Sequence, residues 1–178
     1  MEHVHDYLDI WLNYDTKGKV RITMHIHIES ILKAASEDMD GITETPASNH
    51  LFTVIEDDVT LTGIQANLFW NLVAKILFIS CQSRSNLKTA LVFLTTQVLN
   101  PYGDDYKKLS CMIRYIREMR GMELTLEVKS IYTIQWWIDA TYGMHPYLKG
   151  NYGVMMLLEK VVAASKLSRH RINLRSST

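Results

Sequence analysis

The spacing of apolar residues changes twice along this chain, and this change restricts the fold more than any other feature of the sequence. In the first residues, alternate positions are apolar, a period of two that indicates a strand. From residue 26 to residue 121, apolar residues recur every three or four positions, the period of helices packed on one side. From residue 124 the period of two returns. Strands, then helices, then strands predict an α+β fold.

Turn residues between the periodic segments set the bounds of the expected elements. The turn at residues 15–18 contains a glycine, so the strands on either side of it predict a β-hairpin. The acidic, turn-rich residues 36–49 predict an exposed connection. The expected hairpin strands are 8–14 and 20–24, a helical period covers 26–35, three further helices cover 68–79, 87–98 and 104–121, and later strands cover 124–128, 131–138, 153–158 and 161–164.

The chain has 178 residues, of which 47% are hydrophobic, enough for one ordinary domain or two small ones with an apolar core. Its most apolar run, residues 72–79, is interrupted by Lys75. We therefore expect no membrane span, which needs ~18 apolar residues. Residues 1–20 lack a basic region followed by an apolar stretch, and the cysteines are Cys81 and Cys111. These features predict a reduced, intracellular protein, cytoplasmic or nuclear, that is not secreted.

Acidic and basic residues are divided unevenly, although the formal net charge is zero. Residues 1–60 hold 12 acidic and 4 basic residues, whereas residues 61–178 hold 7 acidic and 15 basic ones. A basic part of this kind favours contact with nucleic acid, although two solvated surfaces of different charge would give the same counts. On the third expected helix, the side chains that would follow a phosphate backbone are Lys107, Lys108, Arg114 and Arg117. The alternative is an ordinary solvated helix face.

Tyr102-Gly103-Asp104-Asp105 matches the Tyr-x-Asp-Asp string whose carboxylates bind two metal ions in polymerase active sites. That chemistry places the string at a β-hairpin turn, whereas here a helical period follows it. Two acids in the first turn of a helix face the positive end of the helix dipole. The sequence therefore predicts that Asp104 caps a helix rather than serving catalysis.

Two other groups of residues are candidate metal ligands. Asp139 ends a strongly β-forming apolar run, where a sheet can fix a carboxylate that still reaches a metal. The alternative is a carboxylate at which the strand simply meets solvent. His3 with His5, and His25 with His27, form two His-x-His pairs that would suit zinc if a hairpin aligned them. Exposed histidines explain the same pattern.

Short motifs follow one another along the chain in an order that resembles copia-type retrotransposon polyproteins, from the C-terminal part of the reverse transcriptase into ribonuclease H. Residues 7–10 are similar to that family's Tyr/Phe-Leu-Gly-hydrophobic strand, with Asp9 in place of the glycine. Residues 83–87 are similar to its Thr-Arg-Pro-Asp-Ile, with Arg84 kept and the proline and aspartate lost. Residues 114–117 are similar to its Arg-Tyr-Leu-Lys helix.

The resemblance extends to the end of the chain. Trp137-Ile138-Asp139-Ala140 is similar to the hydrophobic-x-Asp-Ala with which ribonuclease H begins, and Ser176-Ser177-Thr178 to the Ser-Ser-x before the family's Glu-Ala-Glu helix. It implies a thumb- or connection-like region of the reverse transcriptase at 1–122, with a β-hairpin and three helices. It further implies a truncated N-terminal half of a ribonuclease H-like domain at 123–178.

The same resemblance makes Asp139 the first metal ligand and catalytic carboxylate of ribonuclease H, with Mg²⁺ as the family's cofactor. Two-metal hydrolysis needs several carboxylates around cations ~3.5 to 4 Å apart. One aspartate is an incomplete site, so we expect no tight magnesium binding and no catalysis by this chain alone. In the parent protein the region would serve RNA-directed DNA synthesis and the processing of RNA–DNA hybrids. Its implied partners are nucleic acid and the remaining polyprotein segments, and no membrane.

Two other interpretations stay open. The chain is a small helical protein-interaction module without an enzymatic role, whose apolar stripes bind a partner, or it is one part of an enzyme completed by a segment supplied in trans. If the ribonuclease H resemblance holds, residues 123–178 form a half-sheet with an uncovered apolar face, which we expect to be only marginally stable by itself.

Overall fold

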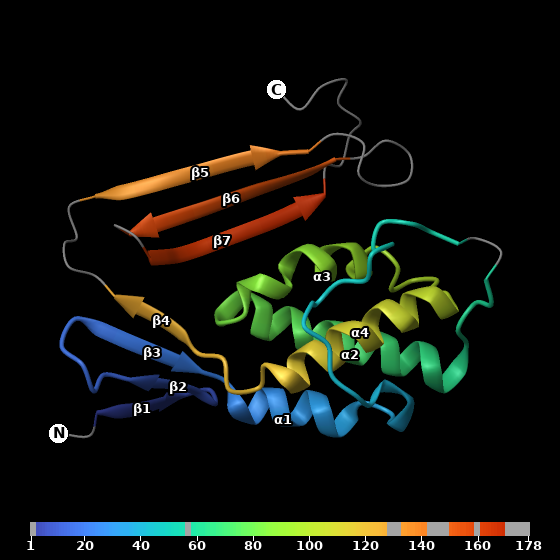
Figure 1. The fold of residues 1–178 in the computed structure, drawn as a ribbon, viewed down its shortest axis with the longest axis horizontal. Helices are drawn as coiled ribbons and strands as arrows, with labels where there is room; N and C mark the ends of the chain where they lie inside the picture. The colour runs from blue at the N-terminus through green and yellow to red at the C-terminus, as the bar shows by residue number, and fades with distance from the viewer. Residues whose placement is uncertain (1–2, 56–57, 128–132, 142–149, 159–160, 170–178) are drawn as a thin grey trace. The chain divides into compact units, whose positions relative to one another are not determined.

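The structure, a computed structural model, describes residues 3–55, 58–127, 133–141, 150–158 and 161–169 (Figure 1). These residues form four α-helices and two antiparallel sheets, so the predicted α+β class is confirmed. The chain divides into two compact units. The first combines Met1–His25 with Gly121–Thr178 and holds the sheets, and the second is Ile26–Arg120, which holds the helices.

The helical unit is built on the periodic apolar residues of the middle of the chain. Its helices are α1 (His25–Ala34), α2 (Gly63–Gln82), α3 (Lys88–Thr95) and α4 (Gly103–Glu118), with 3₁₀ turns η1 (Glu37–Met39) and η2 (Ser85–Leu87). The three helices expected after residue 60 are confirmed, although α2 begins five residues earlier than the apolar period indicates. The fully buried core side chains of these three helices are Phe69, Leu72, Ile76, Ile79, Leu91, Phe93, Leu94, Leu109, Met112, Ile113 and Ile116.

Helix α2 is 20 residues long with a mean hydropathy of 1.4, and it meets the length and composition of a membrane span. The core helix of a globular protein meets the same criterion. One side of α2 packs in the core of the helical unit through Phe69, Leu72 and Ile76. Its other side keeps large side chains exposed, among them Trp70. Part of α2 is therefore a core element, and its outer side is apolar.

The segment from η1 to residue 53 includes most of the connection expected at residues 36–49. Residues 36–49 are mostly exposed, as their acidic, turn-rich composition predicts, but the segment also contributes side chains to the core. Met39 is fully buried and Leu51 is 6% exposed, so both side chains belong to the core of the helical unit. Backbone carbonyls of this segment accept hydrogen bonds from side chains of α4. The buried Met39 was not predicted, because an isolated apolar residue within a polar stretch carries no periodic signal.

One sheet has four strands in the order β1 (Val4–Tyr7), β2 (Ile10–Asn13), β3 (Lys19–Thr23) and β4 (Leu124–Glu127). The strand expected at 8–14 is present as β2 but begins only at Ile10, because the chain reverses at Leu8 and Asp9 into a tight β1–β2 hairpin. The hairpin expected around residues 15–18 is confirmed as β2 and β3.

The four-stranded sheet also joins the two ends of the chain. Strand β4 pairs with β3, with Lys19 opposite Glu127 and Ile22 opposite Leu124. Residues 124–127, which the resemblance assigns to the start of a second domain, thus share a sheet with the N-terminal hairpin.

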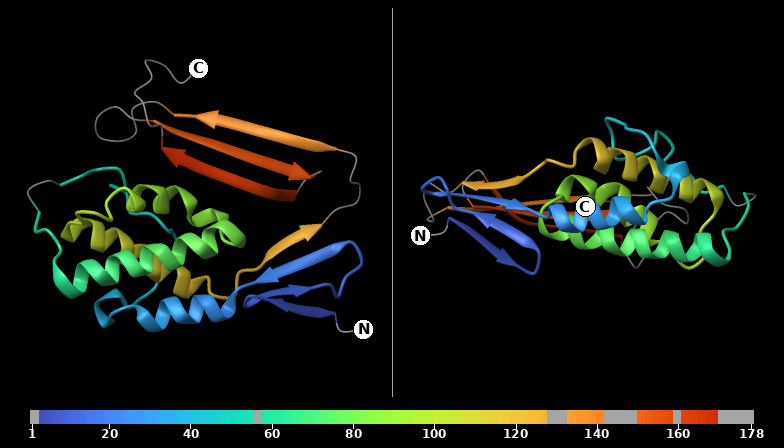
Figure 2. Two further views of the ribbon diagram at one scale, coloured as in Figure 1. Left: turned by 180° about the vertical axis from the view of Figure 1, so that it is seen from behind. Right: turned by 90° about the horizontal axis from the view of Figure 1, so that it is seen from below.

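The other sheet is an antiparallel meander of β5 (Ile134–Ala140), β6 (Asn151–Leu158) and β7 (Val161–Arg169), with β6 in the centre (Figure 2). These strands confirm the period of two expected after residue 131. Strand β7 continues to Arg169, five residues beyond the expected end.

Candidate functional site

The Tyr-Gly-Asp-Asp string lies at the N-terminus of α4, as its helical context predicts. Tyr102 is the N-cap residue, and its backbone N–H donates to Asp105 Oδ2 at 3.0 Å. This hydrogen bond is the return half of a capping box, in which the third helical residue satisfies the N-cap backbone. The placement of both acids in the first turn of a helix is confirmed, but the expectation that Asp104 is the cap is wrong, because Tyr102 is the N-cap residue and Asp105 contacts it.

Asp104 belongs to a buried ion cluster. Its Oδ2 lies 2.8 Å from Lys108 Nζ and its Oδ1 lies 3.0 Å from His50 Nε2. Burial would raise the pKa of Asp104, but hydrogen bonds and charge from Lys108 and His50 outweigh it, so that pKa lies below its usual value. Burial raises the pKa of the neighbouring Asp105, against the hydrogen bond from Tyr102. The pKa values of these two adjacent carboxylates are therefore shifted in opposite directions.

Lys108 is an internal cation and not part of an exposed basic face. It is 2% exposed, it donates to the carbonyl of Thr53, and its Nζ lies 4.7 Å from the centre of the Phe93 ring. The expectation that Lys108 meets a phosphate backbone from an exposed face is therefore wrong in its geometry. Its spacing of four residues from Asp104 is the sequence signal for the intrahelical ion pair that the structure has instead.

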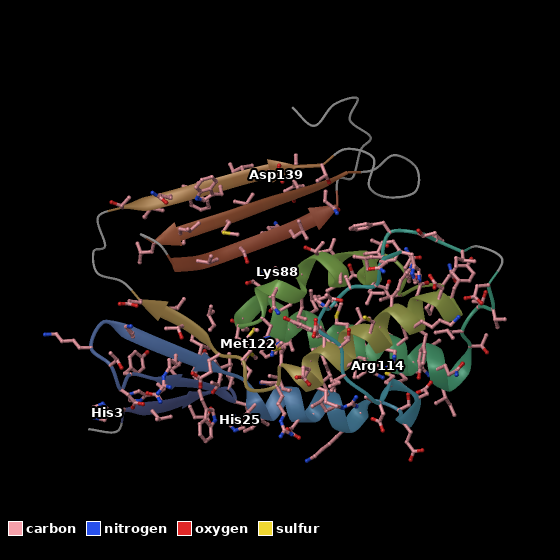
Figure 3. The ribbon with its side chains drawn as sticks, viewed as in Figure 1. His3, His25, Lys88, Arg114, Met122 and Asp139 are labelled. Atoms are coloured by element: carbon pink, nitrogen blue, oxygen red, sulfur yellow. The ribbon has the colours of Figure 1, made fainter. Side chains whose placement is uncertain are left out.

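Arg114 and Arg117 bind the polypeptide segment 38–41. Arg114 donates from Nε to the Asp40 carbonyl at 2.7 Å and from Nη2 to the Asp38 carbonyl at 3.1 Å (Figure 3). Arg117 donates from Nη1 to two further carbonyls, those of Met39 and Gly41, and its Nη2 lies 2.9 Å from Asp40 Oδ1. These two guanidinium groups hold the loop after η1 against α4.

Lys107 is the exposed member of the four predicted basic residues. Arg114 and Arg117 are half-buried and Lys108 is buried, so the four side chains do not make one continuous exposed surface. A nucleic-acid contact at α4 stays a prediction. Lys107 would be the main positive charge of this contact, and the half-buried side chains of Arg114 and Arg117 would contribute less.

Asp139 lies at the end of β5, and its side chain is exposed (Figure 3). Its Oδ1 accepts a hydrogen bond from the backbone N–H of Ala140 at 2.9 Å, and Gly153 lies opposite it on β6. Among the residues that the structure describes, no group of three or more His, Cys, Asp or Glu side chains is placed to hold a metal ion. The described surroundings of Asp139 do not fit a two-cation site.

Three of the four histidines of the two His-x-His pairs lie beside aromatic rings. The ring of His25 is 4.4 Å from Trp11, that of His5 is 5.6 Å from Tyr14, and that of His27 is 4.9 Å from Phe78, all edge to face. His5 on β1 and His25 at the start of α1 are therefore packed against separate aromatic side chains.

A hollow between α1 and α2 was not predicted from the sequence. Its volume is about 350 Å³, and its lining includes His27 and Ser30 from α1 with Lys75 and Phe78 from α2. Lys75 Nζ donates to Ser30 Oγ at 2.9 Å and bridges the two helices, which lie side by side (Figure 2). The lysine that interrupts the most apolar run of the sequence was the signal for this polar contact.

Arg84, at the C-terminal end of α2, is fully buried. Its Nη1 donates to the Met119 carbonyl at 2.9 Å, whereas Nε and Nη2 have no hydrogen-bond partner among the described residues. Burial lowers the pKa of this guanidinium, and the nearby Tyr115 hydroxyl opposes that shift. The Tyr115 hydroxyl accepts a hydrogen bond from Asn86 Nδ2 at 2.8 Å. The Arg84 guanidinium therefore lies in the core without a carboxylate partner among the residues that the structure describes.

Comparison of the chain with protein-family models, with curated proteins and with solved structures finds no match.

Proposed function

We propose that this chain is a fragment of the reverse transcriptase and ribonuclease H region of a copia-type retrotransposon polyprotein, and that it is intracellular. The observation that carries the proposal is the position of Asp139. The Asp-Ala pair ends the first strand of an antiparallel meander, and that meander comes after the helical region, in the order of the family's motifs. A fold by itself does not specify an activity, so the proposal depends on this residue and on the motif order.

The proposed fragment is catalytically inactive by itself. In the parent family Mg²⁺ supplies the chemistry, as a pair of ions held by several carboxylates. The carboxylate that this chain offers is Asp139, and it is exposed to solvent beside Gly153 rather than beside another acid. A complete site would need acidic residues from other segments of the polyprotein.

The proposed residual role is weak contact with nucleic acid through α4. Lys107 extends into solvent one position before the buried Lys108, and Arg114 and Arg117 lie about two and nearly three turns further along the same helix. Their guanidinium groups bind carbonyls of residues 38–41, so a phosphate would compete with those carbonyls for the same donors. The contact is therefore expected to be weaker than that of a freely exposed basic helix.

Fluorescence anisotropy with a labelled RNA–DNA hybrid tests this role. We expect weak binding that Lys107→Ala reduces, because the substitution removes one phosphate contact and lowers the salt slope by ~1. Lys33→Ala is the matched control, since Lys33 is an exposed lysine in the last turn of α1. Equal effects of the two substitutions would contradict a specific contact at α4. Magnesium-dependent cleavage of the hybrid by this chain alone would contradict the proposed inactivity.

A second candidate is a protein-interaction module, and the outer side of α2 favours it. Trp70 is 56% exposed, Leu77 42% and Phe78 40%, and the three side chains follow at helical spacing. Binding of a partner there would bury this stripe. A complex that Trp70→Glu abolishes, formed by a chain with no affinity for polynucleotide, would favour the interaction module over the nucleic-acid fragment.

A further inference from the structure

Strand β5 has a neighbouring strand on one side only, within the part of the chain that the structure describes. Its outer edge presents backbone N–H and C=O groups that another strand can pair with. Edge strands that avoid such pairing carry charged residues, as β7 does with Lys166. In β5, residues 134–138 carry no charge, and the first charged side chain is Asp139. The edge of β5 is therefore unprotected against pairing.

Both faces of the sheet carry an exposed tryptophan at this edge. Trp136 is 61% exposed and its neighbour Trp137 is 64% exposed, and successive residues of a strand point to opposite faces. Ile134 and Ile138, which share a face with Trp136, are 57% and 74% exposed. An incoming strand must therefore match one apolar face and one face where Gln135 and Asp139 flank Trp137, and β5 itself has this pattern.

We propose that β5 pairs antiparallel with β5 of a second copy of this chain, about a two-fold axis at Trp137. Residue Trp137 is the middle of the strand, and an axis there pairs all of Ile134–Ala140 with its counterpart. Trp136 then faces Ile138 on one side of the sheet, and Trp137 faces its own copy on the other. Gln135 faces Asp139, so an amide donor meets the carboxylate and no like charges are opposed. The three-stranded sheet is doubled, and the two-fold axis closes the assembly.

Light scattering at micromolar concentration tests the assembly in the full chain. The expected mass is twice the 20.6 kDa of one chain. Ile138→Lys places a charge at the seam, at a side chain that is already 74% exposed, and is expected to give the monomer. Ile64→Lys is the control, because Ile64 is 87% exposed on α2 and lies outside β5. A monomeric unsubstituted chain, a dimer that survives Ile138→Lys, or aggregates without a discrete dimer would each overturn the proposal.

Disulfide trapping tests the register. In a chain with Cys81→Ser and Cys111→Ser, Trp137→Cys is expected to cross-link under mild oxidation, because facing Cα atoms lie about 4.5 to 5.5 Å apart, within disulfide range. Gln135→Cys is expected to cross-link efficiently only when mixed with a chain that carries Asp139→Cys. Equal self-cross-linking of the Trp137→Cys and Gln135→Cys chains would overturn the register. If a dimer forms only when the labelled RNA–DNA hybrid is present, the edge of β5 binds nucleic acid, and the proposal is also overturned.

Discussion

Lys108 and Asp104 form an ion pair of 2.8 Å one turn apart on α4, and both side chains are almost completely buried. The pair is anchored outside the helix by the Thr53 carbonyl on the lysine and by His50 on the carboxylate. Charges removed from water are tolerated only when they are paired and hydrogen-bonded in this way. This arrangement links α4 to the segment before α2.

Removal of the buried cation is expected to destabilise the protein strongly. Lys108→Met leaves Asp104 buried without its ion-pair partner, and such losses cost about 3 to 5 kcal/mol. Lys107→Met, at the exposed neighbour, is expected to change the free energy of unfolding by less than about 0.5 kcal/mol. Urea unfolding of both variants measures the difference. Similar losses for the two substitutions would show that the buried pair contributes little.

The two acids of α4 are expected to give opposite dependences of stability on pH. The folded-state pKa of Asp104 is lowered, so its contribution is present above the unfolded pKa of about 3.9 and is lost as pH falls through the folded pKa. The folded-state pKa of Asp105 is raised, so its contribution is present below the unfolded pKa and is lost as pH rises through the folded pKa.

The difference in unfolding free energy between pH 7 and pH 3 separates these two effects. It is expected to be smaller for Asp104→Asn than for the unsubstituted chain, and larger for Asp105→Asn. Urea melts at the two pH values give both differences. The same direction of change in both variants would contradict the opposite pKa shifts.

A carboxylate supplied near Arg84 is expected to stabilise the core. Asn86→Asp keeps a partner for the Tyr115 hydroxyl, which interacts with the buried Arg84 guanidinium, and places a negative charge on that shared partner. Hydrogen bonds to charged groups contribute about 1.5 to 3 kcal/mol, so an increase of about 1 kcal/mol in unfolding free energy is expected after desolvation of the carboxylate. Ser85→Asp, the same charge change at the adjacent exposed residue, is the control. An equal gain from Ser85→Asp would point to a general charge effect.

The turn between β1 and β2 is expected to tolerate glycine better than its natural residues. Leu8 and Asp9 have φ angles of 54° and 59°, in the left-handed region that side chains disfavour by roughly 1 kcal/mol. Asp9→Gly is therefore expected to raise the melting temperature, and Leu8→Asn with Asp9→Gly to raise it further, since Asn-Gly suits such turns. Asp6→Gly, within β1, is expected to lower it. A lower melting temperature for Asp9→Gly would contradict the strain at this turn.

The sequence was informative where structure follows a local period. The helices of the middle region are long enough for their apolar stripes to be recognised, and Leu72, Leu109 and Ile113 lie in the core as expected. The Leu8-Asp9 turn was missed because leucine is not a usual turn former at positive φ and no glycine marks the turn. The pairing of β3 with β4 joins residues about a hundred positions apart, and no local pattern encodes it.

The candidate site was less predictable than the fold, because contacts between residues far apart in the sequence decide which of its side chains are exposed. The sequence places Lys107, Lys108, Arg114 and Arg117 on one helix, but it does not show which of them meets solvent. The two arginines donate hydrogen bonds to carbonyls of residues 38–41. Lys108 is buried in an ion pair with Asp104. The position of Asp139 at a strand end was predictable, since the apolar run before it is strongly β-forming.

The salt dependence of binding to an RNA–DNA hybrid tests the proposed function most directly. Two or three phosphate contacts from Lys107, Arg114 and Arg117 predict that log affinity falls with log salt concentration with a slope of about −2 to −3. Anisotropy titrations over a series of salt concentrations give this slope. Absence of binding at low salt, or an affinity that salt does not change, would contradict the proposal that this chain retains nucleic-acid contacts.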